Sequence, residues 1–482
     1  MLDFRPVGYV IGWLVAALGL SMVLPMLADF SAGLAHGRTF ATSAIITIVI
    51  GMSTAFSCAG GNTKAMGVQE SFLLATGVWT VFPFFGALPF LLGAPQASVT
   101  DAFFESMSAL TTTGATVFVG LEHLPPGTLL WRGMLQWFGG LGIVVVAMVF
   151  LPTLKVGGMQ IFKSEAFDTM GKILPRAGEI AFSLTSLYLA LTFLCFMAYV
   201  FSGLESFDAA VHAMTTLATG GMANQDSSYQ DFNATTQYVA IVFMIAAALP
   251  FVRYLQLVAG AARPIWSDPQ VQAFFLVIAV FVALLCAWLA AQQEGPFEPA
   301  FRAVLFNVVS ICTGTGYASA PYDTWGPFAV TMFFVIGLIG GCSGSTACSV
   351  KVFRYQLLLS TISAEVKRLH SPSRVFTPRY HGQPVSQEIL DSVMAFFMFF
   401  FLTMAIVAVL LVMVDLEPIT AISGAASAIA NIGPGLGPEI GPDGNYAGLP
   451  EIAKWILTVT MLIGRLEVLS VFVLFSTAFW RA

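Results

Sequence analysis

The chain alternates long apolar runs with short, half-apolar stretches that end in glycine. Uncharged runs of about 20 residues, the length a helix needs to cross a bilayer, begin near Val7, Thr39, Ser71, Gly133, Ile180, Phe232, Val271, Pro327 and Ser392. A tenth run, Trp455–Trp480, is interrupted by Arg465 and Glu467. The pattern predicts ten membrane spans, and the first run is long enough to be retained rather than cleaved as a signal peptide.

Four of the short stretches share one layout. Their sequences are SMSALTTTGATVF, HAMTTLATGGMAN, NVVSICTGTGYAS and SAIANIGPGLGPE. They recur roughly every hundred residues, which predicts four copies of one unit: a helix, a short re-entrant helix, a glycine loop and a second helix. We therefore expect an all-α integral membrane protein in which two N-terminal helices precede four such units around a pseudo-fourfold pore. The expected boundaries are residues 1–70 for the N-terminal segment and 71–155, 156–265, 266–370 and 371–482 for the pore units.

Composition supports a membrane protein and argues against several functions. Hydrophobic residues make up 57% of the chain and charged residues 10%, with a mean hydropathy of +0.84, whereas a soluble domain carries about 25% charged residues. The six cysteines lie in or beside apolar stretches without a CxxC pair, and the five histidines show no ligand spacing, so neither disulfides nor a zinc or haem site is expected. A membrane-embedded enzyme would need a motif such as HExxH or paired intramembrane acids, and the sequence has neither.

Charge predicts the orientation of the chain and the sign of the transported ion. With both termini cytoplasmic, most lysines and arginines face the cytoplasm, as the positive-inside rule requires, and those outside are Arg38, Arg132, Arg302 and Lys454. Acidic residues gather on the outer side at the short segments, namely Asp101, Glu105, Glu205, Asp208, Glu298 and Glu417. A vestibule rich in carboxylates concentrates cations. We interpret Asp226, Asp231 and Asp443 as ordinary solvated loop residues.

The short segments combine two features of a cation filter. An acid near the start of a short helix complements the helix dipole, whose negative end then points to the membrane centre and stabilises a dehydrated cation. Glycine is needed where the chain turns back so that consecutive carbonyls can face the ion. Irregular backbone is tolerated at that depth only if it is buried in protein or lines a cavity.

At these motifs the chain resembles the Trk/Ktr/HKT superfamily of potassium transporters, most closely the bacterial Trk-type membrane subunit. The resemblance covers nearly the whole chain and rests on TTTGAT at Thr111–Thr116, ATGG at Ala218–Gly221, CTGTGY at Cys312–Tyr317 and NIGPGLGP at Asn431–Pro438. It implies potassium uptake, with potassium as substrate and no cofactor. It also implies a homodimer in a bacterial inner membrane, with one pore per chain.

The resemblance further implies the residues of a selectivity filter. Each loop of the family contributes one glycine and neighbouring carbonyls, which by position are Thr112, Thr113, Gly114, Ala218, Thr219, Gly220, Cys312, Thr313, Gly314, Asn431, Ile432 and Gly433. In plant relatives a serine at the first filter position goes with sodium transport, so glycine in all four loops favours potassium. A sodium-permeable or weakly selective transporter of the same fold is the alternative. The fourth loop lacks the threonine, so its side chains are expected to contribute little.

A polar segment, Gly337–Lys351, interrupts the second helix of the third unit. The resemblance implies that it is an intramembrane gating loop below the filter, with gate residues Gly340, Gly341, Gly344 and Ser345 and with Arg465 as an electrostatic barrier. The alternatives are small residues that allow close helix packing and an arginine bonded to loop carbonyls. Ala347, Cys348 and Ser349 stand where the family has further glycines, which predicts a stiffer loop. Arg253 is expected to snorkel to the cytoplasmic surface.

The largest cytoplasmic connections are expected at Lys155–Glu179 and Lys351–Glu388. The second is basic and predicts either contact with anionic lipid or, as the resemblance implies, docking of a soluble nucleotide-binding Trk regulatory subunit. The chain has no nucleotide motif of its own, and no nucleic-acid partner is expected. A carrier of organic solutes is disfavoured because four glycine-bearing units fit neither two-half nor inverted-repeat carriers. The sequence leaves three modes of transport open: symport with protons, symport with sodium, and uptake driven by the membrane potential alone.

Overall fold

The computed structural model describes residues 3–60, 67–146, 177–261, 263–292 and 296–481. Within these ranges the chain is mostly helical, and its small sheet is a hairpin of β1 (Arg379–Tyr380) and β2 (Gln383–Pro384). The predicted all-α membrane architecture is confirmed. Of the predicted connection Lys155–Glu179, residues 155–176 lie outside the described residues.

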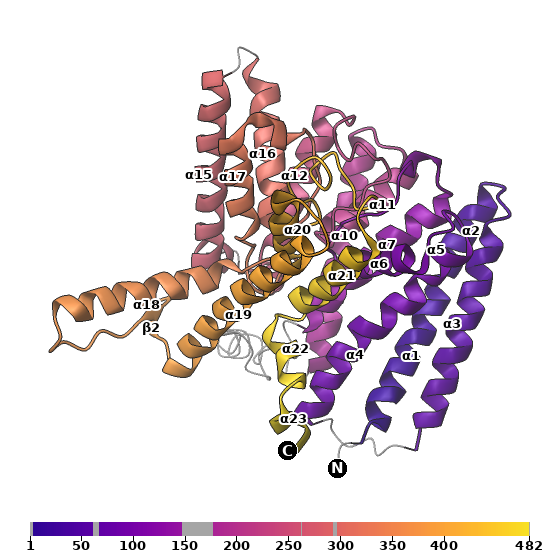
Figure 1. Cartoon of the computed structure of the whole chain (residues 1–482), viewed down its shortest axis with the longest axis horizontal. Coiled ribbons are helices and arrows are strands. Elements are labelled where there is room, and N and C mark those ends of the chain that lie inside the picture. Colours follow the sequence, from indigo (N-terminus) through magenta and orange to yellow (C-terminus); the bar gives the residue numbers. More distant parts are fainter. Residues whose placement is uncertain (1–2, 61–66, 147–176, 262, 293–295, 482) are drawn as a thin grey trace.

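The N-terminal segment is a pair of long helices at one edge of the molecule (Figure 1). Its elements are α1 (Arg5–Ser21), α2 (Val23–Ser31) and α3 (Gly37–Cys58). Helices α1 and α3 cross closely because glycine stands at the contact: a Cβ at Gly12 or Gly51 would collide with the backbone of the opposite helix. Small residues allow such close approach between membrane helices.

Four units follow, and each contains a long helix, a short helix and a second helix, as predicted. The long helices are α4 (Val68–Gly86), α10 (Ala177–Phe201), α15 (Pro269–Gln292) and α19 (Gln387–Val412). The short helices, which we call the pore helices, are α6 (Val99–Leu110), α11 (Ser206–Leu217), α16 (Phe297–Thr313) and α20 (Pro418–Ala430). The second helices are α7 (Pro126–Val145), α12 (Ala234–Ala248), α17 (Pro327–Gly337) and α21 (Glu451–Arg465).

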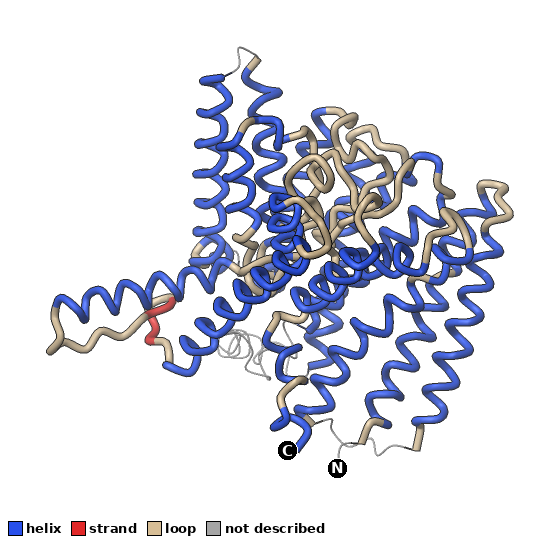
Figure 2. The backbone as a smooth tube through the Cα atoms, viewed as in Figure 1, coloured by secondary structure: helices blue, strands red, loops and turns tan. Residues whose placement is uncertain are grey.

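The remaining elements are short, except α18. They are α5 (Leu88–Leu92), α13 (Phe251–Val258), α14 (Arg263–Trp266), α18 (Val352–His370), α22 (Leu469–Leu474), α23 (Thr477–Arg481) and 3-10 turns at Leu121–His123 and Tyr322–Trp325. Helix α18 projects away from the other helices, and the β1–β2 hairpin follows it (Figure 1). Loops are concentrated around one end of the central helices, near α12 and α20 (Figure 2).

The pore helices begin as their sequences predict. Asp101 and Glu298 lie in the first turns of α6 and α16, and Glu417 is the N-cap of α20. The Ser98 hydroxyl accepts the backbone N–H of Asp101 at 3.1 Å and so caps α6.

The expectation of a continuous span does not hold for three of the four second helices, namely α12, α17 and α21. Among the described residues, six helices are long and apolar enough to cross a membrane. A seventh span arises if α12 and α13, which are bent by 94°, are counted together. Helix α17 is only 11 residues long and gives way to the polar segment after Gly337. Helix α21 ends at Arg465, where Glu467 and Val468 take positive φ.

Candidate functional site

The four glycine loops share one backbone conformation. In each loop two residues, separated by one other, have positive φ: Thr112 and Gly114 (52° and 86°), Thr219 and Gly221 (49° and 77°), Gly314 and Gly316 (74° and 86°), and Asn431 and Gly433 (52° and 104°). The residue between them donates its backbone N–H to a carbonyl near the end of its pore helix: Thr113 to Ser108 (2.9 Å), Gly220 to Thr215 (2.9 Å), Thr315 to Ser310 (2.8 Å) and Ile432 to Ser427 (3.1 Å). The repeated bond aligns the loops residue by residue.

The second residue of each pair is a glycine, and the four glycines form a closed ring, which we call the glycine ring. A Cβ added at each of these glycines would meet a carbonyl oxygen of the next loop: Gly114 that of Gly220, Gly221 that of Thr315, Gly316 that of Ile432, and Gly433 that of Thr113. The four loops therefore contact one another in cyclic order. Positive φ and close carbonyls both disfavour a side chain at these four positions.

The glycine ring corrects the predicted register in two loops. The structural equivalents of Gly114 and Gly433 are Gly221 and Gly316, one and two residues after the predicted Gly220 and Gly314. The carbonyls that precede the ring glycines are those of Thr113, Gly220, Thr315 and Ile432, so the predictions for Thr219 and Thr313 shift as well. Each of these two motifs contains two glycines, and choosing the last one would have given the observed register.

The displaced residues lie on the side of the ring that faces the polar segment. Thr219 and Gly314 occupy the positions of Thr112 and Asn431, and a Cβ at Gly314 would meet the Cys348 side chain at 2.8 Å. Ala218 caps the end of α11, and Cys312 is buried in the last turn of α16.

On its other side the glycine ring opens into a hollow of about 170 Å³, whose lining includes all four ring glycines. The acids in this lining are Asp226 and Asp443, which the sequence pattern assigned to ordinary loops. Asp226 accepts the backbone N–H groups of Gly120 and Leu121 at 2.7 and 3.1 Å. Nearby, burial raises the pKa of the Asp323 carboxyl, and the neighbouring Asp443 charge raises it further.

Two of the acids expected to form this vestibule, Asp101 and Glu105, are paired with basic side chains. Glu105 is fully buried and lies 2.7 Å from the Arg132 guanidinium. Asp101 forms an ion pair with Lys454 at 2.6 Å. The pore-helix acids Glu205, Asp208, Glu298 and Glu417 are absent from the lining of the hollow. The pore-helix acids expected to form the vestibule therefore do not line this hollow. For Asp101 and Glu105 the reason is long-range pairing with cations, which sequence spacing does not show.

Two side chains of α7 hold the first and second loops. Arg132 pairs with Glu105 and donates to the carbonyl of Ala223 at 2.9 Å and to the Thr116 hydroxyl at 3.2 Å. One turn later, Gln136 donates to the Gly220 carbonyl at 2.5 Å and accepts from the Met222 N–H at 3.1 Å. Both side chains are buried, so these charge-assisted and amide bonds fix the backbone on either side of Gly221.

The fourth loop is held by side chains that were expected to contribute little. Asn431 donates from one amide nitrogen to the Thr113 hydroxyl and to the Met461 carbonyl, each at 2.9 Å. The Tyr446 hydroxyl donates to the Gly433 carbonyl at 2.7 Å. In the third loop, Tyr317 contacts the Thr215 hydroxyl of α11 at 2.5 Å.

The polar segment Gly337–Lys351 is a loop that contacts the inner side of the loops. The backbone N–H groups of Cys348 and Ser349 donate to the carbonyls of Thr313 (3.3 Å) and Ala430 (2.9 Å). The Cys348 sulfur is 3.5 Å from the Thr112 hydroxyl. The segment therefore contacts three of the four units, either at the glycine loop or at the end of the pore helix.

The predicted gate residues Gly340–Ser345 tie the same segment to the bend between α12 and α13. Cys342 donates its N–H to the Ala248 carbonyl at 3.0 Å, and the Gly344 carbonyl accepts from Phe251 at 2.9 Å. A Cβ at Gly340 would collide with the Cys348 carbonyl, and one at Gly341 would meet Ala347 at 2.6 Å. The Ser345 hydroxyl closes the turn by donating to the Cys342 carbonyl at 2.6 Å.

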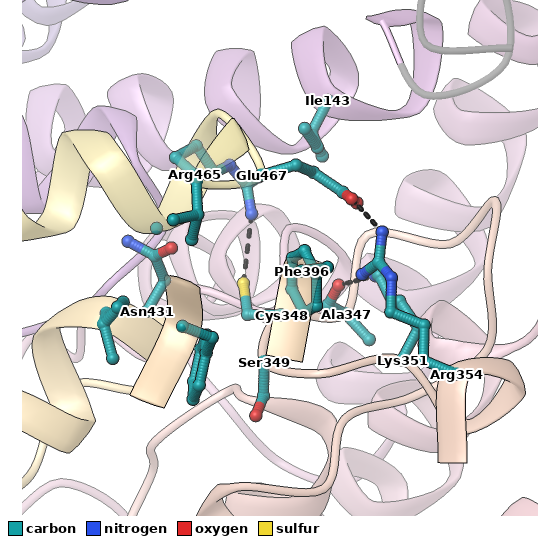
Figure 3. Close-up of a pocket in the computed structure, with 14 residues that line it drawn as sticks. Ile143, Ala347, Cys348, Ser349, Lys351, Arg354, Phe396, Asn431, Arg465 and Glu467 are labelled. Carbon is teal, nitrogen blue, oxygen red and sulfur yellow. Dashed lines mark hydrogen bonds and ion pairs between the residues drawn. The ribbon is translucent and has the colours of Figure 1, made fainter. Parts of the chain in front are cut away.

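Arg465 reaches this segment from the end of α21 (Figure 3). Its guanidinium donates to the Cys348 sulfur at 3.0 Å and to the Gly139 carbonyl at 3.1 Å, and it lies 5.5 Å from the centre of the Trp79 ring. Arg465 therefore lies beside the polar segment, as predicted, and contacts it through Cys348. The sequence singled out Cys348 only as a departure from the family pattern.

Beside Arg465, a small hollow of about 40 Å³ lies on the same side of the ring as the polar segment. Its lining includes Lys351, Arg354 and Glu467, and Arg354 forms a buried ion pair with Glu467 (Figure 3). Arg354 also lies over the Phe396 ring, 3.8 Å from its centre. Glu467 lies two residues after Arg465, a spacing that makes it a poor partner for that arginine within one helix. It pairs with Arg354 and so anchors α18.

Arg253 differs from its prediction. Rather than snorkelling, it is mostly buried and forms an ion pair with Asp268 at 2.8 Å. All six cysteines are free. Within the described ranges, no group of three or more His, Cys, Asp or Glu side chains is placed to hold a metal ion.

Comparison with known proteins gives one consistent family. The model of the TrkH family, described as a cation transport protein, matches residues 36–481. The chain is 46% identical over 414 residues to the Trk system potassium uptake protein TrkI of Halomonas elongata, covering 86% of this chain and 84% of that protein. It is 35% identical over 492 residues to the Trk system potassium uptake protein TrkH of Vibrio parahaemolyticus, covering 100% of both. The crystal structure of the potassium transporter TrkH from that organism matches with a TM-score of 0.92 and 33% identity, covering 100% of both chains.

Proposed function

The chain belongs to the TrkH family of cation transport proteins, and we propose that it takes up potassium through a selectivity filter built by the glycine ring. As a member of this family it is a membrane transporter rather than an enzyme, with potassium as its transported substrate and no cofactor. The observation that carries the proposal is the cyclic contact of four glycines with four carbonyls at one level of the structure. Rings of backbone carbonyls replace the hydration shell of a cation in such filters.

Several features favour potassium over sodium. Each loop has a glycine at the ring position, so no hydroxyl or methyl group narrows the path there. Buried side chains hold the loops at fixed separation, through Gln136 and Arg132 on one side and through Asn431 and Tyr446 on the other. A weakly selective or sodium-permeable pathway is the alternative, and an ion-flux assay separates the two.

We also propose that the segment Gly337–Lys351 and Arg465 form the gate. The segment contacts the inner side of the loops and is anchored to the bend between α12 and α13. The Arg465 guanidinium adds a positive charge close to Cys348, and a positive charge in a dry, narrow passage raises the free energy of a passing cation. Opening would require the segment to leave its bonds to Thr313 and Ala430.

The basic connection after the gate is the proposed docking surface for a soluble nucleotide-binding regulatory subunit. Helix α18 projects from the molecule and ends with Lys367, Arg368 and His370 in its last turn (Figure 1). It begins directly after Lys351, so a pull on α18 would reach the gate through the backbone. We further propose a homodimer in the inner membrane, with one pore in each chain.

The test of the proposed function uses potassium and sodium side by side. A bacterium that lacks potassium uptake should grow on low potassium when it expresses the chain. Liposomes that contain the purified protein should take up potassium faster than sodium. Equal rates for the two ions would favour the weakly selective alternative, and absence of flux for either ion together with absence of growth rescue would contradict the proposal.

A further inference from the structure

An apolar cavity lies outside the proposed ion pathway, between α1, α4, α7 and α10. Its volume is about 540 Å³. Its lining is almost wholly apolar, and the hydroxyl side chains among the lining residues are Ser21, Ser71 and Thr185. Two lining residues, Trp79 and Leu110, are only 3% exposed and form the inner wall.

We propose that this cavity binds an acyl chain of a membrane lipid. Three of its four walls, α1, α4 and α10, belong to helices that are long and apolar enough to cross a membrane. On α1, the lining residues Leu14 and Ala17 are exposed, and Leu14 is 40% exposed. The cavity is therefore continuous with the hydrocarbon-facing surface of the N-terminal segment.

The chemistry of the lining selects hydrocarbon over other occupants. A cavity holds water only where about two to four polar partners surround each molecule, and here three hydroxyls are spread over three helices. An empty cavity would deprive its lining atoms of dispersion contacts. An ion or a polar solute would lose its hydration without compensation. The bilayer itself supplies flexible apolar chains at the rim.

The inner wall of the cavity touches the proposed gate. The Trp79 ring, which lines the cavity, lies 5.5 Å from the Arg465 guanidinium. Leu110 ends the pore helix α6, and Trp79, Leu110 and Leu466 pack into one small apolar cluster. A chain in the cavity therefore supports the residues that hold Arg465 against Cys348. This effect on transport rests on the proposed function, whereas binding of the chain does not.

The site is tested with a photoactivatable lipid. The full-length protein is reconstituted with a phospholipid whose acyl chain carries a diazirine, and the crosslinked peptides are identified by mass spectrometry. We expect labelling of the α4 and α7 segments that line the cavity. Gly142 lines the cavity from α7, and a Cβ there would make an ordinary 3.5 Å contact with Trp79. Gly142→Leu should therefore fill the space and reduce this labelling several-fold.

Two further variants keep the test decisive. Ala75→Leu fills the cavity from α4 and replaces Gly142→Leu if that variant does not fold. Ile45→Phe enlarges a side chain on α3 that is 63% exposed and lies outside the cavity lining, so it should leave the labelling unchanged. Two results would overturn the proposal. One is labelling of α4 and α7 that neither cavity-filling variant reduces. The other is labelling of α4 and α7 no stronger than that of α3, which would mean that protein fills the space. Potassium flux is measured on the same samples. Loss of labelling with normal flux would contradict the link to the gate and leave the filter untouched.

Discussion

At the scale of single residues, Gly314 and Gly316 offer a matched pair that tests the glycine ring. Both have positive φ (74° and 86°), so replacement by alanine carries a similar backbone cost of roughly 1–2 kcal/mol at either position. Only at Gly316 would the new Cβ collide with a carbonyl of the ring, that of Ile432. We expect Gly316→Ala to abolish potassium flux or its preference over sodium. Gly314→Ala should keep the preference, since its Cβ meets Cys348 instead and Asn431 already occupies the equivalent position in the fourth loop. Ion-flux ratios in liposomes measure the difference, and equal loss of preference in both variants would contradict the observed register.

At the scale of elements, the proposed gate predicts that Arg465→Ala raises potassium flux. The variant removes a positive charge next to Cys348 and the hydrogen bond that ties the polar segment to the end of α21. It also removes the hydrogen bond from Arg465 to the Gly139 carbonyl of α7. Arg253→Ala is the control, because Arg253 is also a mostly buried arginine but is paired with Asp268. Losing one partner of such an ion pair leaves a charge uncompensated and costs stability, so the control should lower the unfolding temperature without raising flux. If folded Arg465→Ala protein conducts no faster than the unchanged chain, the arginine is a packing element.

The elements also show what sequence can and cannot predict here. Apolar runs and their spacing predicted the long helices, the pore helices and the break after Gly337, because these depend on local composition. The predicted register of the second and third loops differs from that of the glycine ring, because each loop has two glycines and only the contacts in the folded structure show which one stands in the ring. Glu105 and Arg132 were both assigned to the outer face by charge counting, whereas they neutralise each other in the interior. Such pairing joins residues 27 positions apart on different helices, and one sequence contains no signal for it.

At the scale of the whole molecule, α18 is the proposed link between the membrane part and a soluble regulatory subunit. We expect the basic residues near its end to hold that subunit. Reversing the basic residues near the end of α18 with Lys367→Glu, Arg368→Glu and Arg374→Glu should weaken capture of the regulatory subunit, because the docking surface loses its positive charge. The fold should be unaffected, since the ion pair of Arg368 with Glu365 is solvent-exposed and contributes little stability. Arg38→Glu, at the N-terminal end of α3, is the matched control for a change of surface charge.

Pull-down with the purified subunit and liposome flux with and without nucleotide are measured on each variant. Loss of capture together with loss of the nucleotide response, but with potassium preference intact, would support docking at α18. Normal capture and a normal nucleotide response in the triple variant would place the subunit elsewhere. A response to anionic lipid content alone would show instead that the basic segment contacts the membrane surface.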